Sequence, residues 1–326
     1  MDILRRVLYI CAVLSLTLCS HLAGAAPKAL VVLIPGFGSS ILHEIPPHDL
    51  PPESVSPYFS ATVAGTMIEA GYDVLALKGM GSAADFAVNG GRAISQINEY
   101  MLRYQGNPPP VYLLGHSMGG LLSLYVTNEI GFEVPIKKII LLSTPLRGSK
   151  VANKIANGII PLRLAEKAAE ALSGIVDLRG IVQMTTPKVD AFIAQLRLPA
   201  GIDIRAFSGV QPRNKLILPS WDAPIQSPLY IPFAKLVGED SDGVVGLSSS
   251  LPKTMAIPSI GKNRLMVQSE PLVAELDHEE QHMDYRVIED LFQTDEVDFI
   301  DQKQREFYQH MIRCWELPSC MPVGNK

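Results

Sequence analysis

The chain has 326 residues, of which 47% are hydrophobic and 19% are charged, and its formal net charge is -5. This length and composition suit a large folded domain and exclude a disordered chain. Because the net charge is negative and the sequence has no cluster of basic residues, we expect no nucleic-acid partner.

The start of the chain has the pattern of a secretory signal peptide. Arg5 and Arg6 form a basic region, an apolar run covers 7–18, and Ala23-Gly24-Ala25 is a small-residue cleavage site. The apolar run is shorter than a membrane span. We therefore predict a signal peptide over 1–25 and a secreted or periplasmic protein.

Cysteine usage agrees with export. Two of the four cysteines lie in the predicted signal peptide, so Cys314 and Cys320 remain in the mature chain. Because exported proteins fold in an oxidising compartment, we predict a disulfide between these two residues. The sequence has no Cys-x-x-Cys motif and no zinc-type spacing of His and Cys, and it predicts no metal site and no cofactor.

Strand-like and helix-like segments alternate along the predicted mature chain, 26–326. Continuous apolar runs predict buried strands, and amphipathic segments between them predict helices. The predicted strands cover 29–34, 72–77, 111–114, 137–142 and 202–210, with 265–267 and 271–276 as later candidates, and the predicted helices cover 58–70, 84–103, 121–126 and 285–292. This alternation predicts a single α/β domain with a mostly parallel central sheet flanked by helices.

One segment, 150–198, differs from this alternation. It holds three amphipathic helical stretches, at 151–156, 162–172 and 189–196, and no strand-like run. A helical insertion between two strands lies most simply over the carboxyl ends of the strands, where ligands bind. We therefore predict a helical cap insertion at about 150–198 in preference to crossover helices along the side of the sheet.

The strongest functional signal is Gly115-His116-Ser117-Met118-Gly119, between a predicted strand and a predicted helix. It fits G-x-S-x-G, and strand, sharp turn and helix are the context of a nucleophile elbow. The glycines allow close approach of the chain, and the helix N-terminus offers N–H groups to a developing oxyanion. A serine that only caps the helix is the weaker interpretation, because the strand, the helix and Gly120 are all present.

A nucleophilic serine needs a histidine to take its proton and an acid to orient that histidine, in the chain order Ser, acid, His. Asp242, in a turn between the serine and the later histidines, is our first choice of acid, and Asp240 is the second. His278 follows a strand candidate and precedes a predicted helix, so we favour it as the base, with His282 as the alternative. We place His310 at the surface of a C-terminal helical tail.

The oxyanion requires two N–H donors. One is the residue after the nucleophile, Met118, and the other belongs to the loop after the first long strand. Phe37, between Gly36 and Gly38, is our choice in that loop, because flanking glycines let the peptide plane turn toward a ligand.

Four segments together resemble the α/β-hydrolase superfamily, and within it the secreted bacterial lipases and esterases. They are 34–38 (IPGFG), 115–120 (GHSMGG), 143–149 (STPLRGS) and 241–245 (SDGVV). The resemblance implies the α/β-hydrolase fold, with Ser117 as nucleophile, Asp242 as acid and His278 as base. It also implies a small-molecule ester or lipid substrate and transient contact with a lipid surface.

We therefore predict a secreted serine hydrolase that cleaves carboxylic esters through an acyl-enzyme. An acyltransferase that passes the acyl group to an alcohol or lipid uses the same residues and remains an alternative. A non-catalytic binding protein on the same scaffold is an alternative of a different class, which the ordered serine, acid and histidine candidates disfavour.

Overall fold

The computed structural model describes residues 26–37, 49–81, 84–131, 133–160, 179–210, 237–270, 276, 278, 281 and 294–317. Several predictions concern residues that lie outside this set. They are the signal peptide (1–25), the helices at 162–172 and 285–292, most of the strand candidate 271–276, His282 and Cys320.

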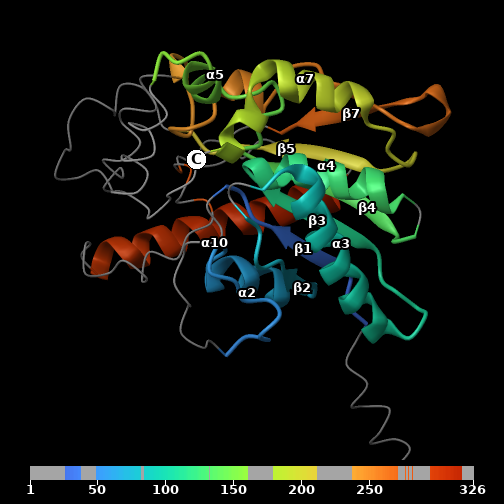
Figure 1. The fold of residues 1–326 in the computed structure, drawn as a ribbon. Coiled ribbons are helices and arrows are strands. Elements are labelled where there is room, and N and C mark those ends of the chain that lie inside the picture. The colour runs from blue at the N-terminus through green and yellow to red at the C-terminus, as the bar shows by residue number, and fades with distance from the viewer. Residues whose placement is uncertain are drawn as a thin grey trace, which may run out of the picture.

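A seven-stranded sheet with the order β2-β1-β3-β4-β5-β7-β6 forms the centre of the molecule (Figure 1). The strands are β1 Leu30–Ile34, β2 Asp73–Ala76, β3 Val111–His116, β4 Ile136–Leu142, β5 Asp203–Phe207, β6 Ala256–Pro258 and β7 Arg264–Ser269. All neighbouring pairs are parallel except β6 and β7, which are antiparallel. The predicted fold class is therefore confirmed.

Helices cover both faces of this sheet. Leu30, Val32 and Ile34 of β1 belong to an apolar cluster with residues of α3 (Phe86–Met101), α4 (Met118–Ile130) and α7 (Thr186–Gln195). The alternate residues Val31 and Leu33 belong to a second cluster with α2 (Ala61–Glu69) and α10 (Thr294–Glu316). Burial on both faces explains why β1 is a continuous apolar run.

Side chains at the N-cap positions fix where two of these helices begin. The Ser60 side chain accepts a hydrogen bond from the Val63 N–H at the start of α2, and Asp85 accepts one from the Val88 N–H at the start of α3. Each bond satisfies an N–H group that has no carbonyl partner within its helix.

The predicted insertion at 150–198 is described at its two ends. It begins with α5 (Lys150–Ala156) and ends with the 3-10 helix η2 (Arg179–Met184) and α7. Val189 and Ile193 of α7 are buried in the same cluster as the sheet, and the rings of Phe86 and Phe192 lie 5.2 Å apart. This last part of the segment therefore packs like a crossover helix between β4 and β5, and the cap remains a prediction.

The C-terminal helix α10 packs against α2 and is more deeply buried than predicted. Ser60 donates to Oε1 of Gln304 across this contact (2.7 Å). His310 is only 7% exposed, so its predicted surface position is wrong. It lies one helical turn from Cys314, whose sulfur is 3.1 Å from His310 Nε2. The predicted pairing of Cys314 with Cys320 stays a prediction, because Cys320 lies outside the described residues.

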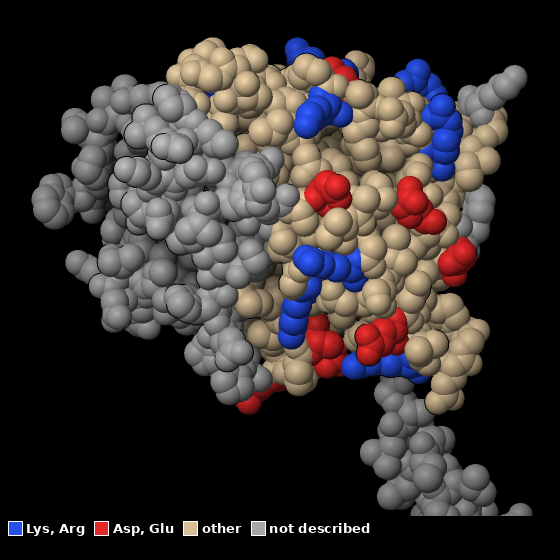
Figure 2. Space-filling model, in the orientation of Figure 1, with Lys and Arg blue, Asp and Glu red and all other residues tan. Residues whose placement is uncertain are grey.

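The surface of the described part carries charges of both signs. On the face shown in Figure 2, basic and acidic side chains are interspersed among uncharged residues, without a broad patch of one sign. Among the helices that the structure describes, none has the length and apolar character needed to cross a membrane.

Candidate active site

Ser117 lies at the sharp turn between β3 and α4. Its backbone has φ 54° and ψ −127°, and residues with a side chain rarely adopt a positive φ. The Ser117 N–H donates to the carbonyl of Leu142 at the end of β4 (2.8 Å), which ties the turn to the neighbouring strand. Although Ser117 occupies the N-cap position of α4, its side chain makes no capping hydrogen bond. The hydroxyl therefore does not serve as a helix cap.

Two glycines let the loop after β1 touch this turn. A Cβ added to Gly36 would lie 2.9 Å from the Cβ of Ser117, and one added to Gly119 would lie 2.2 Å from the carbonyl oxygen of Ile34. Neither position has room for a larger residue. The strand order places this contact between β1 and β3, where the chain changes direction across the sheet and where ligands of α/β proteins bind.

The two residues predicted to bind an oxyanion lie on either side of this contact. Met118 is the first residue of α4, so its N–H is among those that have no carbonyl partner within the helix. Phe37 follows in the loop after β1, and its side chain packs against the small apolar cluster of Val151, Ile155 and Val237. The backbones of both residues thus come from segments that adjoin Ser117.

Asp242 and His278 form a buried hydrogen-bonded pair. The Asp242 Oδ2 lies 2.7 Å from His278 Nδ1, and the His278 backbone N–H donates to the Asp242 carbonyl at 2.9 Å. Asp242 is fully buried and His278 is 6% exposed, whereas Asp240 is exposed. The structure thus brings together the first choices of acid and base, while the alternative base, His282, lies outside the described residues.

The surroundings of Asp242 favour a charged carboxylate. Burial alone raises its pKa, but the His278 imidazole, the Val245 N–H and the Ser143 hydroxyl outweigh burial and hold the pKa of the carboxyl below its usual value. Its Oδ1 accepts hydrogen bonds from the N–H groups of Val244 (3.0 Å) and Val245 (2.8 Å). The carboxylate is fixed in place with its other oxygen toward the imidazole.

No hydrogen bond joins the Ser117 hydroxyl to the His278 imidazole in the described part of the chain. The Ser117 side chain makes no hydrogen bond in the described part of the chain, so the structure brings the acid to the histidine but not the histidine to the serine. The two residues are connected through His116, which precedes Ser117 in the chain and whose ring centroid lies 4.5 Å from that of His278. Such serine–histidine bonds are often long before substrate binds.

Four further polar side chains around Asp242 were not predicted. Gln281 is fully buried, its Nε2 lies 3.4 Å from Asp242 Oδ2, and its Oε1 accepts from the Ser143 hydroxyl at 2.7 Å. Ser143 and Ser250 each lie within hydrogen-bond distance of the Ser208 hydroxyl. Ser143 follows β4 and Ser208 follows β5, so this network lies along the same edge of the sheet as Ser117.

Tyr58 is a second unpredicted neighbour of the site. Its hydroxyl lies 2.8 Å from Nδ1 of His116, and both residues are buried. A Cβ on Gly36 would come within 2.4 Å of the same hydroxyl. Tyr58 therefore contacts both the residue before Ser117 and the loop after β1.

Within the described residues there is no group of three His, Cys, Asp or Glu side chains that is arranged to hold a metal ion. The described side chains around Ser117 instead offer one carboxylate, two imidazoles and several hydroxyls, which suit proton transfer.

Comparisons with known proteins agree with this architecture. Residues 70–176, less than half of the chain, match the family model described as a PGAP1-like alpha/beta domain. This range includes β3, the turn at Ser117 and α4. No curated protein matches the sequence.

Two solved structures show the same arrangement over most of their length. Lipase BlEst2 from Bacillus licheniformis, in its mature form, has a TM-score of 0.50 at 15% identity, covering 78% of this chain and 86% of that chain. Lipase 1 from Pelosinus fermentans has a TM-score of 0.52 at 13% identity, covering 78% and 93%. Similarity at these identities establishes the fold. The parallel sheet, the turn at Ser117 and these neighbours give the chain the α/β-hydrolase fold.

Proposed function

We propose that the protein is a serine hydrolase of carboxylic esters. The observation that carries the proposal is the 2.7 Å hydrogen bond between buried Asp242 and His278 beside the strained turn at Ser117. A carboxylate that holds one imidazole nitrogen leaves the other nitrogen to act as a base toward a serine hydroxyl. The two lipases of the same fold support an ester as the substrate.

In the proposed mechanism Ser117 Oγ attacks the ester carbonyl while His278 Nε2 takes the hydroxyl proton. Asp242 keeps the other ring proton on Nδ1 and stabilises the imidazolium. The N–H groups of Met118 and Phe37 bind the oxyanion of the tetrahedral intermediate, each contributing roughly 10²–10³-fold to turnover. His278 then gives its proton to the leaving alcohol, and a water molecule activated in the same way releases the acid.

The test is turnover of p-nitrophenyl esters by Ser117→Ala protein. We expect a fall of roughly 10⁴-fold or more with the fold retained. Ser248→Ala is the matched control, because Ser248 is an exposed serine that contacts Glu239 rather than Asp242 or His278. Activity that survives in Ser117→Ala, or that is lost equally in both variants, would contradict the mechanism.

The proposed substrate is a small-molecule ester or a lipid. We also propose transient contact of the protein with a lipid surface, and we expect no nucleic-acid partner. A chain-length series of p-nitrophenyl esters, run beside a phospholipid, defines the acyl preference. Products formed with and without an added alcohol separate hydrolysis from acyl transfer, since a transferase would yield the new ester. A fluorophosphonate probe that failed to label Ser117 would favour the non-catalytic alternative.

We further propose export, from the signal-peptide pattern of residues 1–25, and a disulfide between Cys314 and Cys320. The mass of the protein recovered from the periplasm or medium tests both. An N-terminus at Ala26 and a gain of two alkylation adducts only after reduction are the expected results.

A further inference from the structure

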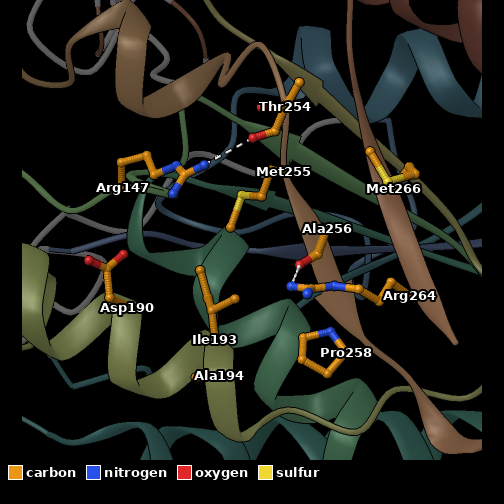
Figure 3. Close-up of a pocket in the computed structure, with 10 residues that line it drawn as sticks. All are labelled: Arg147, Asp190, Ile193, Ala194, Thr254, Met255, Ala256, Pro258, Arg264 and Met266. Atoms are coloured by element: carbon orange, nitrogen blue, oxygen red, sulfur yellow. Dashed lines mark hydrogen bonds between the residues drawn. The ribbon is translucent and has the colours of Figure 1, made fainter. Parts of the chain in front are cut away.

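A pocket of about 450 Å³ lies away from Ser117, at the β6 edge of the sheet. Figure 3 shows it between α7, the loop after β4, and strands β6 and β7. Ile193, Met255, Pro258 and Met266 give it an apolar lining. Three charged residues, Arg147, Arg264 and Asp190, complete the wall. The volume is in the range of pockets that hold small molecules.

The two arginines of this pocket have more N–H donors than their hydrogen bonds in the described structure use. Arg147 Nη2 donates to the Thr254 carbonyl (2.9 Å) and Arg264 Nη2 to the Ala256 carbonyl (3.0 Å). A guanidinium has five N–H donors. Neither arginine makes any other side-chain hydrogen bond or an ion pair in the structure as described.

The buried Arg205 is an example of an arginine with several protein partners. Its guanidinium contacts Asp203, Glu270 and the carbonyls of Cys314 and Leu317. The exposed pocket arginines have no such carboxylate partners among the residues that the structure describes. A ligand anion would supply to them the charge-assisted bonds that Arg205 obtains from the protein.

The two arginines bind carbonyls on either side of Met255 in the chain. Arg147 donates to the Thr254 carbonyl and Arg264 to the Ala256 carbonyl, whereas the Met255 carbonyl accepts a hydrogen bond from the Val267 N–H of β7. In the view of Figure 3, Met255 lies between the two arginine side chains.

We propose that this pocket binds a carboxylate that carries an alkyl chain, such as a medium-chain fatty acid anion. The arginine side chains of Arg147 and Arg264 bind the carboxylate, and the alkyl chain lies on the apolar side chains of Ile193, Met255 and Met266. Two arginines and one aspartate leave one positive charge in excess, which a single carboxylate neutralises. The proposal rests on the proposed function only for the origin of the ligand, because ester hydrolysis releases such an acid.

Calorimetric titration of the whole protein with octanoate, 1-octanol and inorganic phosphate tests the site. We expect octanoate to bind at least tenfold more tightly than 1-octanol, because the alcohol cannot bond to both arginines as an anion. Inorganic phosphate, which has no apolar part, should bind more weakly than octanoate. Equal affinity for octanoate and 1-octanol, or phosphate binding as tight as octanoate binding, would overturn the proposal.

Variants then locate the binding. Arg147→Gln and Arg264→Gln should each weaken octanoate binding by about tenfold or more. Asp190→Asn removes a negative charge from the pocket and leaves both arginine–carbonyl hydrogen bonds in place, so it should strengthen octanoate binding several-fold. Arg305→Gln is the control, since it removes the same charge from α10, where Arg305 pairs with Glu69. If octanoate binds the Arg147→Gln/Arg264→Gln double variant and the unchanged protein equally, the pocket is not the site.

The same titration on Ser117→Ala protein separates the two proposals. Carboxylate binding should persist in that variant whether or not Ser117 is the nucleophile. Loss of ester turnover with retained binding supports both proposals. Normal binding with turnover that does not depend on Ser117 would remove the hydrolase mechanism and leave the pocket intact.

Discussion

The Tyr58 hydroxyl lies 2.8 Å from Nδ1 of His116, the residue immediately before Ser117. The His116 ring also lies against the His278 ring, with centroids 4.5 Å apart. Tyr58 thus fixes the orientation of a ring that in turn supports the proposed base. Tyr58 is therefore a positioning residue, which orients His116 and acts on the proposed base only through the His116 ring.

Tyr58→Phe tests this support. The variant loses the hydrogen bond between the Tyr58 hydroxyl and the buried His116 imidazole, so we expect the free energy of unfolding to fall by about 1 kcal/mol. We also expect a lower kcat for ester turnover with little change in KM, because the ring beside His278 is less firmly held. Urea unfolding and steady-state kinetics measure the two effects.

Tyr112→Phe is the control for Tyr58→Phe, since the half-buried Tyr112 hydroxyl makes no hydrogen bond in the described part of the structure. Equal behaviour of the two variants would contradict the role of Tyr58.

Gly36→Ala tests the close contact between the loop after β1 and the turn at Ser117. The added Cβ would lie 2.4 Å from the Tyr58 hydroxyl and 2.9 Å from the Ser117 Cβ, so the loop must move away. Since that loop carries the proposed Phe37 donor, we expect turnover to fall by roughly 10²-fold or more. Gly91→Ala is the matched control, because a Cβ there meets nothing within 4 Å and Gly91 lies inside α3. That variant should be more stable by roughly 0.5–1 kcal/mol, as seen in thermal or urea unfolding, with unchanged turnover.

The sequence was informative wherever one local pattern fixes the structure. A continuous apolar run identified β1, because a central parallel strand is buried on both faces. The turn at Ser117 was recognisable because its glycines meet a steric requirement within five residues. Asp242 and His278 were found by their order along the chain, although 36 positions separate them.

Other features were missed because they depend on contacts between distant segments. Tyr58 and Gln281 reach the site from parts of the chain that carry no motif, and their roles follow only from the packed fold. β6 was missed because it has three residues and ends in Pro258, as an edge strand can. His310 was predicted at the surface as part of a C-terminal helical tail, yet it lies one helical turn from buried Phe307 and Cys314 on the same face of α10.

Stability at low pH should report on Asp242. Its pKa is lowered in the folded protein, so the folded state binds this proton less readily than the unfolded state does. Its contribution to stability is therefore complete above the unfolded pKa of about 4 and is lost as the pH falls through the lower folded value. We expect Asp242→Asn to be less stable than the unchanged protein near pH 7 and the difference to shrink below about pH 4. Urea unfolding at a series of pH values measures this, and a difference that grows toward low pH would contradict the assignment.

Arg205 should be the strongest single anchor of the C-terminal helix. Its side chain is 4% exposed, pairs with buried Glu270 at 3.3 Å and with Asp203 at 3.0 Å, and donates to the carbonyls of Cys314 and Leu317. Arg205→Met removes the guanidinium that pairs with the buried Glu270 carboxylate, and we expect a loss of about 3–5 kcal/mol in the free energy of unfolding.

Arg103→Met is the control for Arg205→Met, because Arg103 pairs with Glu53 at the surface and such pairs contribute less than about 1 kcal/mol. Hydrogen exchange of the α10 amides distinguishes loss of the helix anchor from general destabilisation. In Arg205→Met the amides near Cys314 should lose protection before those of β1 and β3. Uniform loss of protection across the sheet and α10 would show that Arg205 stabilises the whole domain rather than the end of this helix.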